Sequence, residues 1–260
     1  MATTFKTITA NDATNTRTLL HEAIPLTGTI ASGTYGDENI KTFSHGMFES
    51  VFDYPFLSSS ANHVFDITHG YSNTSTLSGT TAHIQNSKKI NVYNQMAAVL
   101  VGHDATGSIQ LFDQDGDIAG GGAKMEEVFF FNFARLLTKD EVKKDSFRLN
   151  LATGSVPGNL KDHILAIGDY GAASSYLVNS PAGEYGILYT SSATPNTSSG
   201  VGHIYYQAGI AVLSASIFDG EFGARAATYE TASIARVLSG SNITASCDGL
   251  RNRFYNVQFN

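Results

Sequence analysis

The feature of this sequence that most constrains its fold is a series of short segments in which apolar side chains recur at every second residue. Because successive side chains of a β-strand point to opposite faces, this period predicts strands. Loops rich in Gly, Ser, Thr and Asn separate the segments, and those four residue types make up more than a third of the 260 residues. The strand-like segments from residue 109 onward are 129–133, 147–151, 163–167, 176–178, 185–190, 201–206, 209–215 and 254–259.

This pattern predicts a mainly β protein, namely a β-sandwich of short antiparallel strands decorated with one or two helices. The strands do not alternate regularly with helices, which argues against a doubly wound parallel sheet. An earlier strand is expected at residues 64–68. Phe129, Phe131 and Phe133 share one face of their segment, and residues 147–151 alternate in the same way. We therefore expect these two segments to pair as a hairpin with one apolar face.

The clearest helix is expected near residues 86–101. Asn86 or Ser87 is expected to cap its N-terminus. Gly102 suits the left-handed position that closes a helix. The apolar residues of this segment recur at steps of three and four, which places them on one stripe: Ile90, Tyr93, Met96, Ala97 and Leu100.

Two further segments carry weaker helical signals. A short Ala-rich helix is expected near residues 224–238, stopping at Gly240. The spacing of apolar residues at 47–52 also indicates one or two helical turns, which Pro55 ends because proline lacks the donor N–H.

The first 42 residues contain isolated apolar side chains, such as Phe5 and Ile8, in Thr-rich surroundings. This predicts an extended N-terminal arm over residues 1–42, followed by a single β-rich domain over residues 43–260. Two roles for the arm remain open: docking on a neighbouring subunit, or closing onto its own core. The first ten residues lack the apolar stretch of a secretory signal, so no signal peptide is expected.

Charge and composition exclude several classes of protein. Lys and Arg number 16 against 23 Asp and Glu, which argues against a nucleic-acid-binding surface. Cys247 is the single cysteine, so the chain has neither an internal disulfide framework nor a Cys-rich zinc site. The longest apolar run, residues 96–101, is far shorter than a membrane span. We therefore expect neither nucleic acid nor membrane among the partners.

The most ligand-like cluster is Asp113, Asp115 and Asp117. Three carboxylates at alternate positions can converge on a hard cation in a tight loop. The calcium-binding EF-hand loop has Gly at its sixth position and Glu at its twelfth, where this chain has Ile118 and Lys124. An acidic turn between strands is therefore favoured, and these three residues remain weak candidates for a metal site.

No catalytic motif stands out elsewhere in the sequence. The segment 120–124 lacks the Gly-Lys-Ser/Thr of a phosphate-binding loop, and no Gly-x-Ser-x-Gly elbow occurs. His63 and His69 flank one predicted strand, on the same side and about 20 Å apart, too far to share a metal. A lone cysteine such as Cys247 is usually buried rather than nucleophilic. The sequence therefore predicts no enzyme activity, no catalytic residues and no cofactor.

Four segments, in this order, resemble a β-rich module of virion structural proteins from contractile-tailed phages of marine cyanobacteria. In such phages the module occurs in baseplate and neck components. The segment 17–25 (RTLLHEAIP) also looks like the start of such a protein. The four segments are 133–149 (FARLLTKDEVKKDSFRL), 186–190 (GILYT), 201–213 (VGHIYYQAGIAVL) and 250–259 (LRNRFYNVQF).

The resemblance implies a structural component of a tailed-phage virion, in the tail, baseplate or neck. Such a protein acts by contacts with other virion proteins and with copies of itself in a symmetric ring. It is located in the virion, which is assembled in the host cytoplasm. The alternative is a fibre-like receptor- or carbohydrate-binding module. The absence of Trp makes a sugar-binding groove less favoured, because such grooves usually use Trp platforms.

Overall fold

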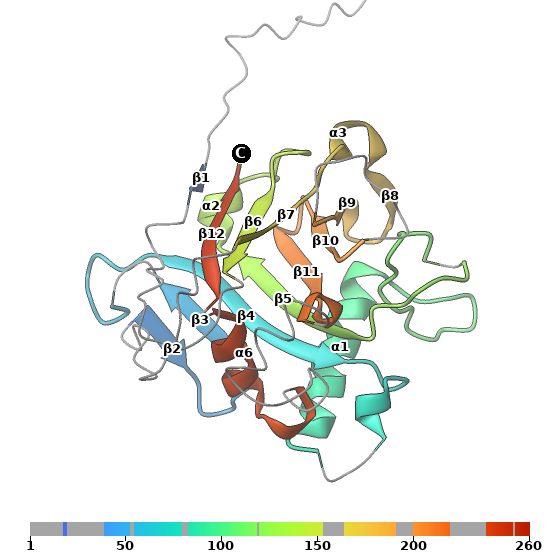
Figure 1. Ribbon diagram of the computed structural model, residues 1–260, viewed down its shortest axis with the longest axis horizontal. Coiled ribbons are helices and arrows are strands. Elements are labelled where there is room, and N and C mark those ends of the chain that lie inside the picture. Colours follow the sequence, from blue (N-terminus) through green and yellow to red (C-terminus); the bar gives the residue numbers. More distant parts are fainter. Residues whose placement is uncertain are drawn as a thin grey trace, which may run out of the picture.

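The computed structural model describes residues 18–19, 39–52, 55–79, 83–118, 120–152, 164–190, 200–218, 238–251 and 253–260. Its larger sheet has eight antiparallel strands in the spatial order β2-β3-β4-β5-β11-β10-β9-β8 (Figure 1). The bounds of these strands are β2 Ile40–Thr42, β3 Glu49–Phe52, β4 His63–Tyr71, β5 Glu127–Phe133, β11 Ile210–Ser214, β10 Gly202–Tyr205, β9 Gly183–Leu188 and β8 Leu177–Ser180.

A second antiparallel sheet has four strands in the order β1-β12-β6-β7. Its strands are β1 Thr18–Leu19, β12 Phe254–Phe259, β6 Arg148–Ala152 and β7 Ile164–Gly168. Helical elements of the described residues are α1 Asn86–Leu100, α2 Arg135–Thr138, α3 Ala172–Ser175, α6 Ile243–Arg251, and the 3-10 turns η4 Thr76–Ser78 and η7 Ala215–Phe218. The prediction of a mainly β fold with few helices is confirmed.

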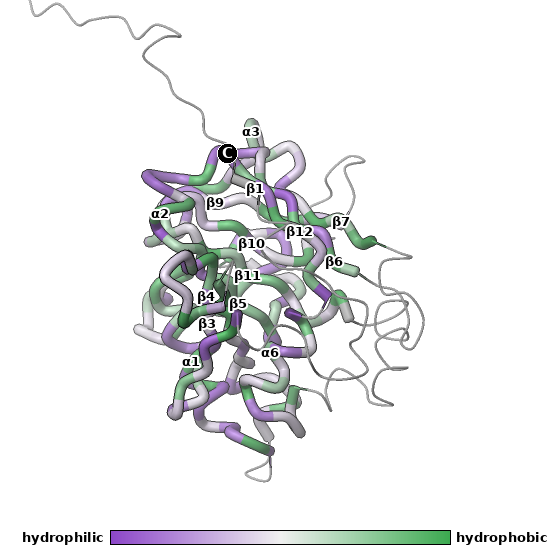
Figure 2. Tube along the Cα trace, turned by 90° about the vertical axis from the view of Figure 1, so that its left-hand side faces the viewer, coloured by the Kyte–Doolittle hydropathy of each residue, from purple (hydrophilic) through white to green (hydrophobic). Residues whose placement is uncertain are grey.

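The two sheets pack face to face through aromatic side chains. Phe254 of β12 stacks on Phe65 of β4, with 5.1 Å between ring centroids. Phe259 of β12 meets Phe133 of β5 at 5.3 Å. Figure 2 shows the layers from the side, with β6, β7 and β12 on one side of β4 and β5 and helix α1 on the other.

Helix α1 confirms the helix predicted near residues 86–101, and it lies directly on β4. Gly70 allows this contact, because a Cβ at that position would lie 2.4 Å from the Lys89 carbonyl oxygen and 2.8 Å from the Tyr93 nitrogen. Gly102 has a φ of 93° and its N–H donates to the Ala97 carbonyl at 2.9 Å, which confirms it as the closing residue.

The N-terminal cap of α1 differs from the prediction. Gln85, with a left-handed φ of 54°, precedes the helix, and its side chain makes no capping hydrogen bond. The Asn86 side chain is used elsewhere, since its Oδ1 accepts a hydrogen bond from the Tyr71 hydroxyl at 2.8 Å. A tertiary contact thus replaces the local cap.

The hairpin expected between residues 129–133 and 147–151 is wrong, because the two strands belong to different sheets. β5 pairs with β4 and β11, whereas β6 pairs with β12 and β7. Both faces of β5 are covered: Phe130 packs on Phe112, and Phe131 packs on Phe254. Alternation assigns the faces of a strand, but it does not choose the neighbouring strand.

The helical turns expected at residues 47–52 are also wrong, since β3 occupies 49–52. β3 pairs with β2 on one side and β4 on the other, and these backbone hydrogen bonds outweigh the local spacing. The helix expected near residues 224–238 lies outside the described residues, apart from its last residue. Helix α6 was not predicted; its Cys247 and Leu250 are buried against the sandwich.

Strand β12 pairs with β6 and β1 of the same chain. Alternation in the sequence predicts one apolar face made of Tyr255, Val257 and Phe259. The observed face differs from it, because Tyr255 is 38% exposed whereas Phe254 is buried. An irregularity in the pairing between Phe254 and Asn256 shifts the alternation by one residue. Val257 and Phe259 are buried as predicted.

Two short strands join part of residues 1–42 to the sandwich. β2 pairs with β3 at the edge of the large sheet, and β1 pairs with β12, with Thr18 opposite Phe259. The rest of the predicted arm, residues 1–17 and 20–38, lies outside the described residues. The β1 contact favours closure onto the chain's own core at that point.

Candidate functional site

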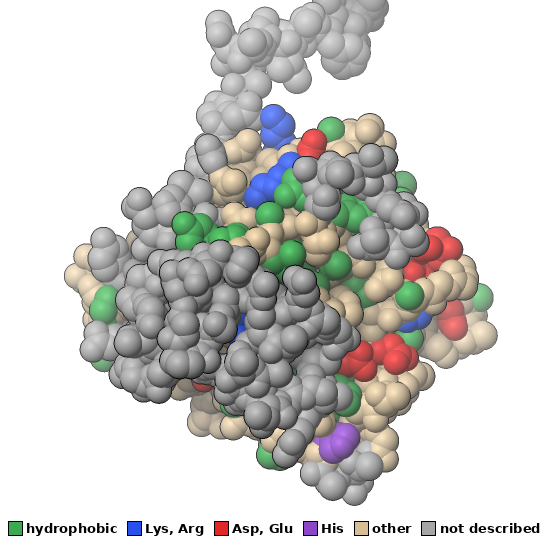
Figure 3. Space-filling model, viewed as in Figure 1, with side chains coloured by type: hydrophobic (Ala, Val, Ile, Leu, Met, Phe, Trp, Pro, Cys, Tyr) green, Lys and Arg blue, Asp and Glu red, His purple; other side chains and the backbone are tan. Residues whose placement is uncertain are grey.

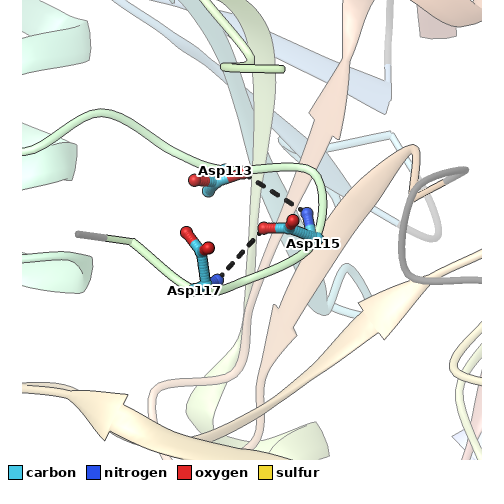
Figure 4. Close-up of side chains that lie close together, drawn as sticks. All are labelled: Asp113, Asp115 and Asp117. Atoms are coloured by element: carbon cyan, nitrogen blue, oxygen red, sulfur yellow. Dashed lines mark hydrogen bonds between the residues drawn. The ribbon is translucent and has the colours of Figure 1, made fainter. Parts of the chain in front are cut away.

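The three weak metal candidates come together in a tight loop between α1 and β5. Asp113 is buried and Asp117 exposed, with Asp115 between them, and their carboxylate oxygens lie within 4.8 Å of one another. The backbone N–H of Asp115 donates to Asp113 at 3.4 Å, and that of Asp117 to Asp115 at 3.2 Å (Figure 4). Figure 3 shows acidic side chains gathered on the surface where this loop lies. Carboxylates this close repel one another and favour a nearby positive charge.

The Lys124 ammonium supplies a positive charge from within the chain. It forms an ion pair with Asp113, whose side chain is fully buried. It also donates to the carbonyl oxygens of Ile118 at 3.2 Å and Gly120 at 3.0 Å. Oxygen atoms of these kinds are the ligands of a hard cation. Lys124, the residue that breaks the calcium pattern at its twelfth position, thus occupies the cation's role.

Hydrogen bonds at Gly116 and Gly120 hold the backbone of the loop in place. Ile118 stands at the sixth position of the calcium pattern and has the left-handed φ of 52° that a glycine would adopt more easily. The Gly116 carbonyl accepts hydrogen bonds from the Tyr185 hydroxyl and the Asn179 amide, each at 2.9 Å. The segment 120–124, weighed as a phosphate loop, directs the Gly120 N–H to Asp117 at 3.0 Å.

We expect Lys124→Gln to destabilise the fold by about 3–5 kcal/mol, because it leaves the buried Asp113 carboxylate without its cation. Thermal unfolding of the wild type should not change with a chelator or with added calcium. The variant should gain stability in calcium, because the carboxylates then have room for a metal. Lys143→Gln, at an exposed position, is the matched control. Stoichiometric calcium binding by the wild type, lost in Asp115→Ala together with a drop in melting temperature, would contradict this expectation.

The histidine pair of β4 does not lie on one side as predicted. The His63 ring is 2.8 Å from Asp66 Oδ1, on the α1 face of the sheet. The His69 ring is fully buried beside Phe129, on the face that meets the second sheet. A pairing irregularity next to His63 shifts the alternation and separates the two rings. His21 and His163 lie outside the described residues.

Ser50, Asp66 and His63 form a hydrogen-bonded group at the start of β4. The Ser50 hydroxyl donates to Asp66 Oδ1 at 2.6 Å, and His63 approaches the same oxygen. A serine nucleophile needs the histidine as its direct base, with the carboxylate behind the histidine. Here the carboxylate lies between the two, so this group does not activate the serine.

A groove on the α1 face is a concave site that sequence reasoning missed. Its volume is about 460 Å³. The charged group in it is Asp66: burial raises the pKa of this carboxyl, but hydrogen bonds from His63 and Ser50 outweigh burial and hold the pKa below its usual value. The lining residues come from β4, β5, β11, α1 and the segment before β3: His45, Met47, Phe48, Asp66, Thr68, Val92, Gln95, Met96, Phe130, Asn132 and Ile210.

Cys247 is buried in α6, with its Sγ 3.6 Å from the Ile67 carbonyl oxygen. Burial raises the pKa of its thiol, and the nearby Glu49 and Asp248 add to this. Both effects disfavour the thiolate, the nucleophilic form. The prediction that Cys247 is buried is confirmed.

Among the described residues, no helix has the length and apolar character needed to cross a bilayer. The chain matches no model of a protein family, no curated protein and no solved structure.

Proposed function

We propose that the protein is a structural component of a tailed-phage virion, in the tail, baseplate or neck. It acts by contacts with other virion proteins and with copies of itself in a symmetric assembly, without catalysis and without a cofactor. The observation that carries the proposal is the ordered set of four segments that resemble a module of such proteins. The proposed location follows: the virion, after assembly in the host cytoplasm.

The four segments are joined by contacts within and between the two sheets. Residues 186–188 pair with 202–204, and residues 148–149 pair with 257–258. The rings of Phe133, Phe147 and Phe259 form one cluster, with centroids 5.3 to 6.4 Å apart. The Val142 N–H donates to the Tyr206 carbonyl oxygen at 3.0 Å. These contacts bring together segments that are far apart in the chain. Their contact therefore supports a single structural unit.

Asp169 connects these segments through its buried carboxylate. It accepts hydrogen bonds from the Phe147 N–H at 3.0 Å, the Arg148 guanidinium at 2.8 Å and the Tyr206 hydroxyl at 2.9 Å. Burial raises the pKa of Asp169 to about 6, against the opposing effect of these partners. The unit is thus held by one polar centre as well as by aromatic packing.

The second candidate is a receptor- or carbohydrate-binding module, and the groove on the α1 face favours it. The aromatic rings of Phe48 and His45 and the polar side chains of Asp66 and Asn132 line this groove. Rings and carboxamide or carboxylate groups together are a common way to bind a sugar. Specific binding of the isolated protein to a glycan array, or to host cells, would favour this candidate over the first.

Immunogold electron microscopy of purified particles tests the structural proposal. Antibody raised against the purified protein should label intact particles at the tail, its baseplate or the neck. Label confined to unassembled material in the lysate, with none on particles, would contradict the proposal. Particles treated with pre-immune serum are the control.

A further inference from the structure

An exposed leucine lies next to the apolar groove, on the same side of the molecule. Leu136 of α2 is 90% exposed, more than any other large apolar side chain of the described residues. Figure 2 shows α2 and α1 on one side of the sandwich, away from β6 and β7. Exposure of a single leucine is common, so the residues around Leu136 decide whether it marks an interface.

The turn that carries Leu136 is held firmly in place. The Ala134 N–H donates to the Val64 carbonyl oxygen at 2.9 Å, and the Leu137 N–H to the Ala134 carbonyl at 2.8 Å. The Arg135 guanidinium donates to the Gln207 carbonyl oxygen at 2.8 Å. An apolar side chain presented on a fixed turn loses little conformational freedom on binding. We call residues 135–139 the α2 knob.

The groove complements the α2 knob in polarity and in charge. Its walls are mostly apolar, with Met47, Phe48 and Met96 among them, and Asp66 is its charged group. Arg135 and Lys139 flank Leu136 in sequence, and both are exposed. A leucine between two cations therefore matches an apolar groove that contains a carboxylate.

The α2 knob and the groove share a border. Asn132 and Ile210 line the groove, and the residues next to them, Phe133 and Gly209, are joined by a backbone hydrogen bond of 3.0 Å. Gly209 also packs on Thr138 of α2. When the α2 knob and the groove are adjacent on one face, a two-fold axis places the knob of each copy in the groove of the other at the same time.

We propose that this face is a two-fold contact between two copies of the chain, in which Leu136 of each copy enters the groove of the other. The flanking cations approach Asp66 of the partner copy. This contact does not depend on the proposed virion function. It pairs subunits and does not close a ring, because a ring needs a separate head-to-tail contact.

Sedimentation velocity of the purified full chain tests the contact, with Leu136→Asp as the main variant. The wild type should form dimers, or larger assemblies of even order, and Leu136→Asp should weaken the association about tenfold or more. Val178→Asp is the matched control, since Val178 is 68% exposed on β8 at the far edge of the large sheet. Because Leu136 and Val178 are exposed, both variants should keep the wild-type melting temperature at concentrations too low for association.

A cysteine pair checks the same contact without disturbing the fold. Leu136→Cys combined with Gln95→Cys should form an intermolecular disulfide under mild oxidation, since the natural Cys247 is buried. Val178→Cys with Gln95→Cys should not. A wild type that stays monomeric up to about 100 µM would overturn the proposal and leave the groove to a different partner. An odd-numbered assembly, or association unchanged in Leu136→Asp, would overturn it as well.

Discussion

Deletion of residues 254–260 is expected to abolish folding of the isolated chain. β12 lies between β1 and β6 in the second sheet, so its loss removes the pairing of β1 and leaves one edge of β6 open. Its Phe254, Val257 and Phe259 are buried, and truncating one buried phenylalanine costs about 3–5 kcal/mol. Loss of the whole strand therefore approaches the total stability of a domain, about 5–15 kcal/mol.

Circular dichroism and urea unfolding measure this effect. Single substitutions in β12 show how much each side chain contributes to the free energy of unfolding. Phe254→Ala should lower the free energy of unfolding by about 3–5 kcal/mol. Tyr255→Ala, at the half-exposed neighbouring position, should cost much less. A deletion variant that still unfolds cooperatively, but does not join the particle, would show that the strand serves assembly and not the core.

The second large effect is a loss of stability in mild acid, caused by two buried histidines. Burial lowers the pKa of His69 to about 3 and that of His203 to about 4. An unfolded chain takes up these protons near pH 6.5, but the folded chain does so only near pH 3 to 4. Stability is therefore full above pH 6.5 and falls as the pH decreases. Each histidine contributes a slope of about 1.4 kcal/mol per pH unit.

Asp169 acts in the opposite direction over part of this range. Because its folded pKa is raised to about 6, the folded chain takes up this proton before the unfolded chain does. Between pH 6 and 4, the proton that folded Asp169 takes up thus offsets one of the two protons that the histidines take up in the unfolded chain. We expect a net loss of about 1.4 kcal/mol per pH unit in this window.

Urea unfolding over a pH series measures the net slope. His69→Phe should remove most of it and raise stability at every pH. Neither nitrogen of the His69 ring has a hydrogen-bond partner within the described part of the chain. His45→Gln, at an exposed position, is the control and should keep the wild-type profile. A profile that is flat in the wild type, or unchanged in His69→Phe, would show that His69 is not held neutral by burial.

The sequence predicts local structure better than strand pairing. The period of two correctly located most strands, and the stripe of apolar residues located α1. The partner of β5 was missed because pairing is decided by non-local contacts, here with residues 63–71 and 210–214. Helix α6 was missed although Ile243, Cys247 and Leu250 recur at steps of four and three. The segment has only nine residues, so its helical state also depends on packing against the sandwich.

The candidate sites show the same limit. The acidic loop was found because its three carboxylates are close in sequence. The role of Lys124 was not found, because a departure from a motif does not show which atoms the side chain at that position contacts. The groove brings together residues from 45 to 210, and the only local signal was the polar Asp66 and Thr68 between buried residues of β4.

The copy number of the chain in purified particles tests its proposed role as a structural virion protein. Quantitative mass spectrometry against labelled peptides of this chain and of the major capsid protein measures it. A structural tail, baseplate or neck protein should be present at a fixed, low multiple set by the symmetry of that assembly. Absence from particles, or an amount that varies between preparations, would contradict the account.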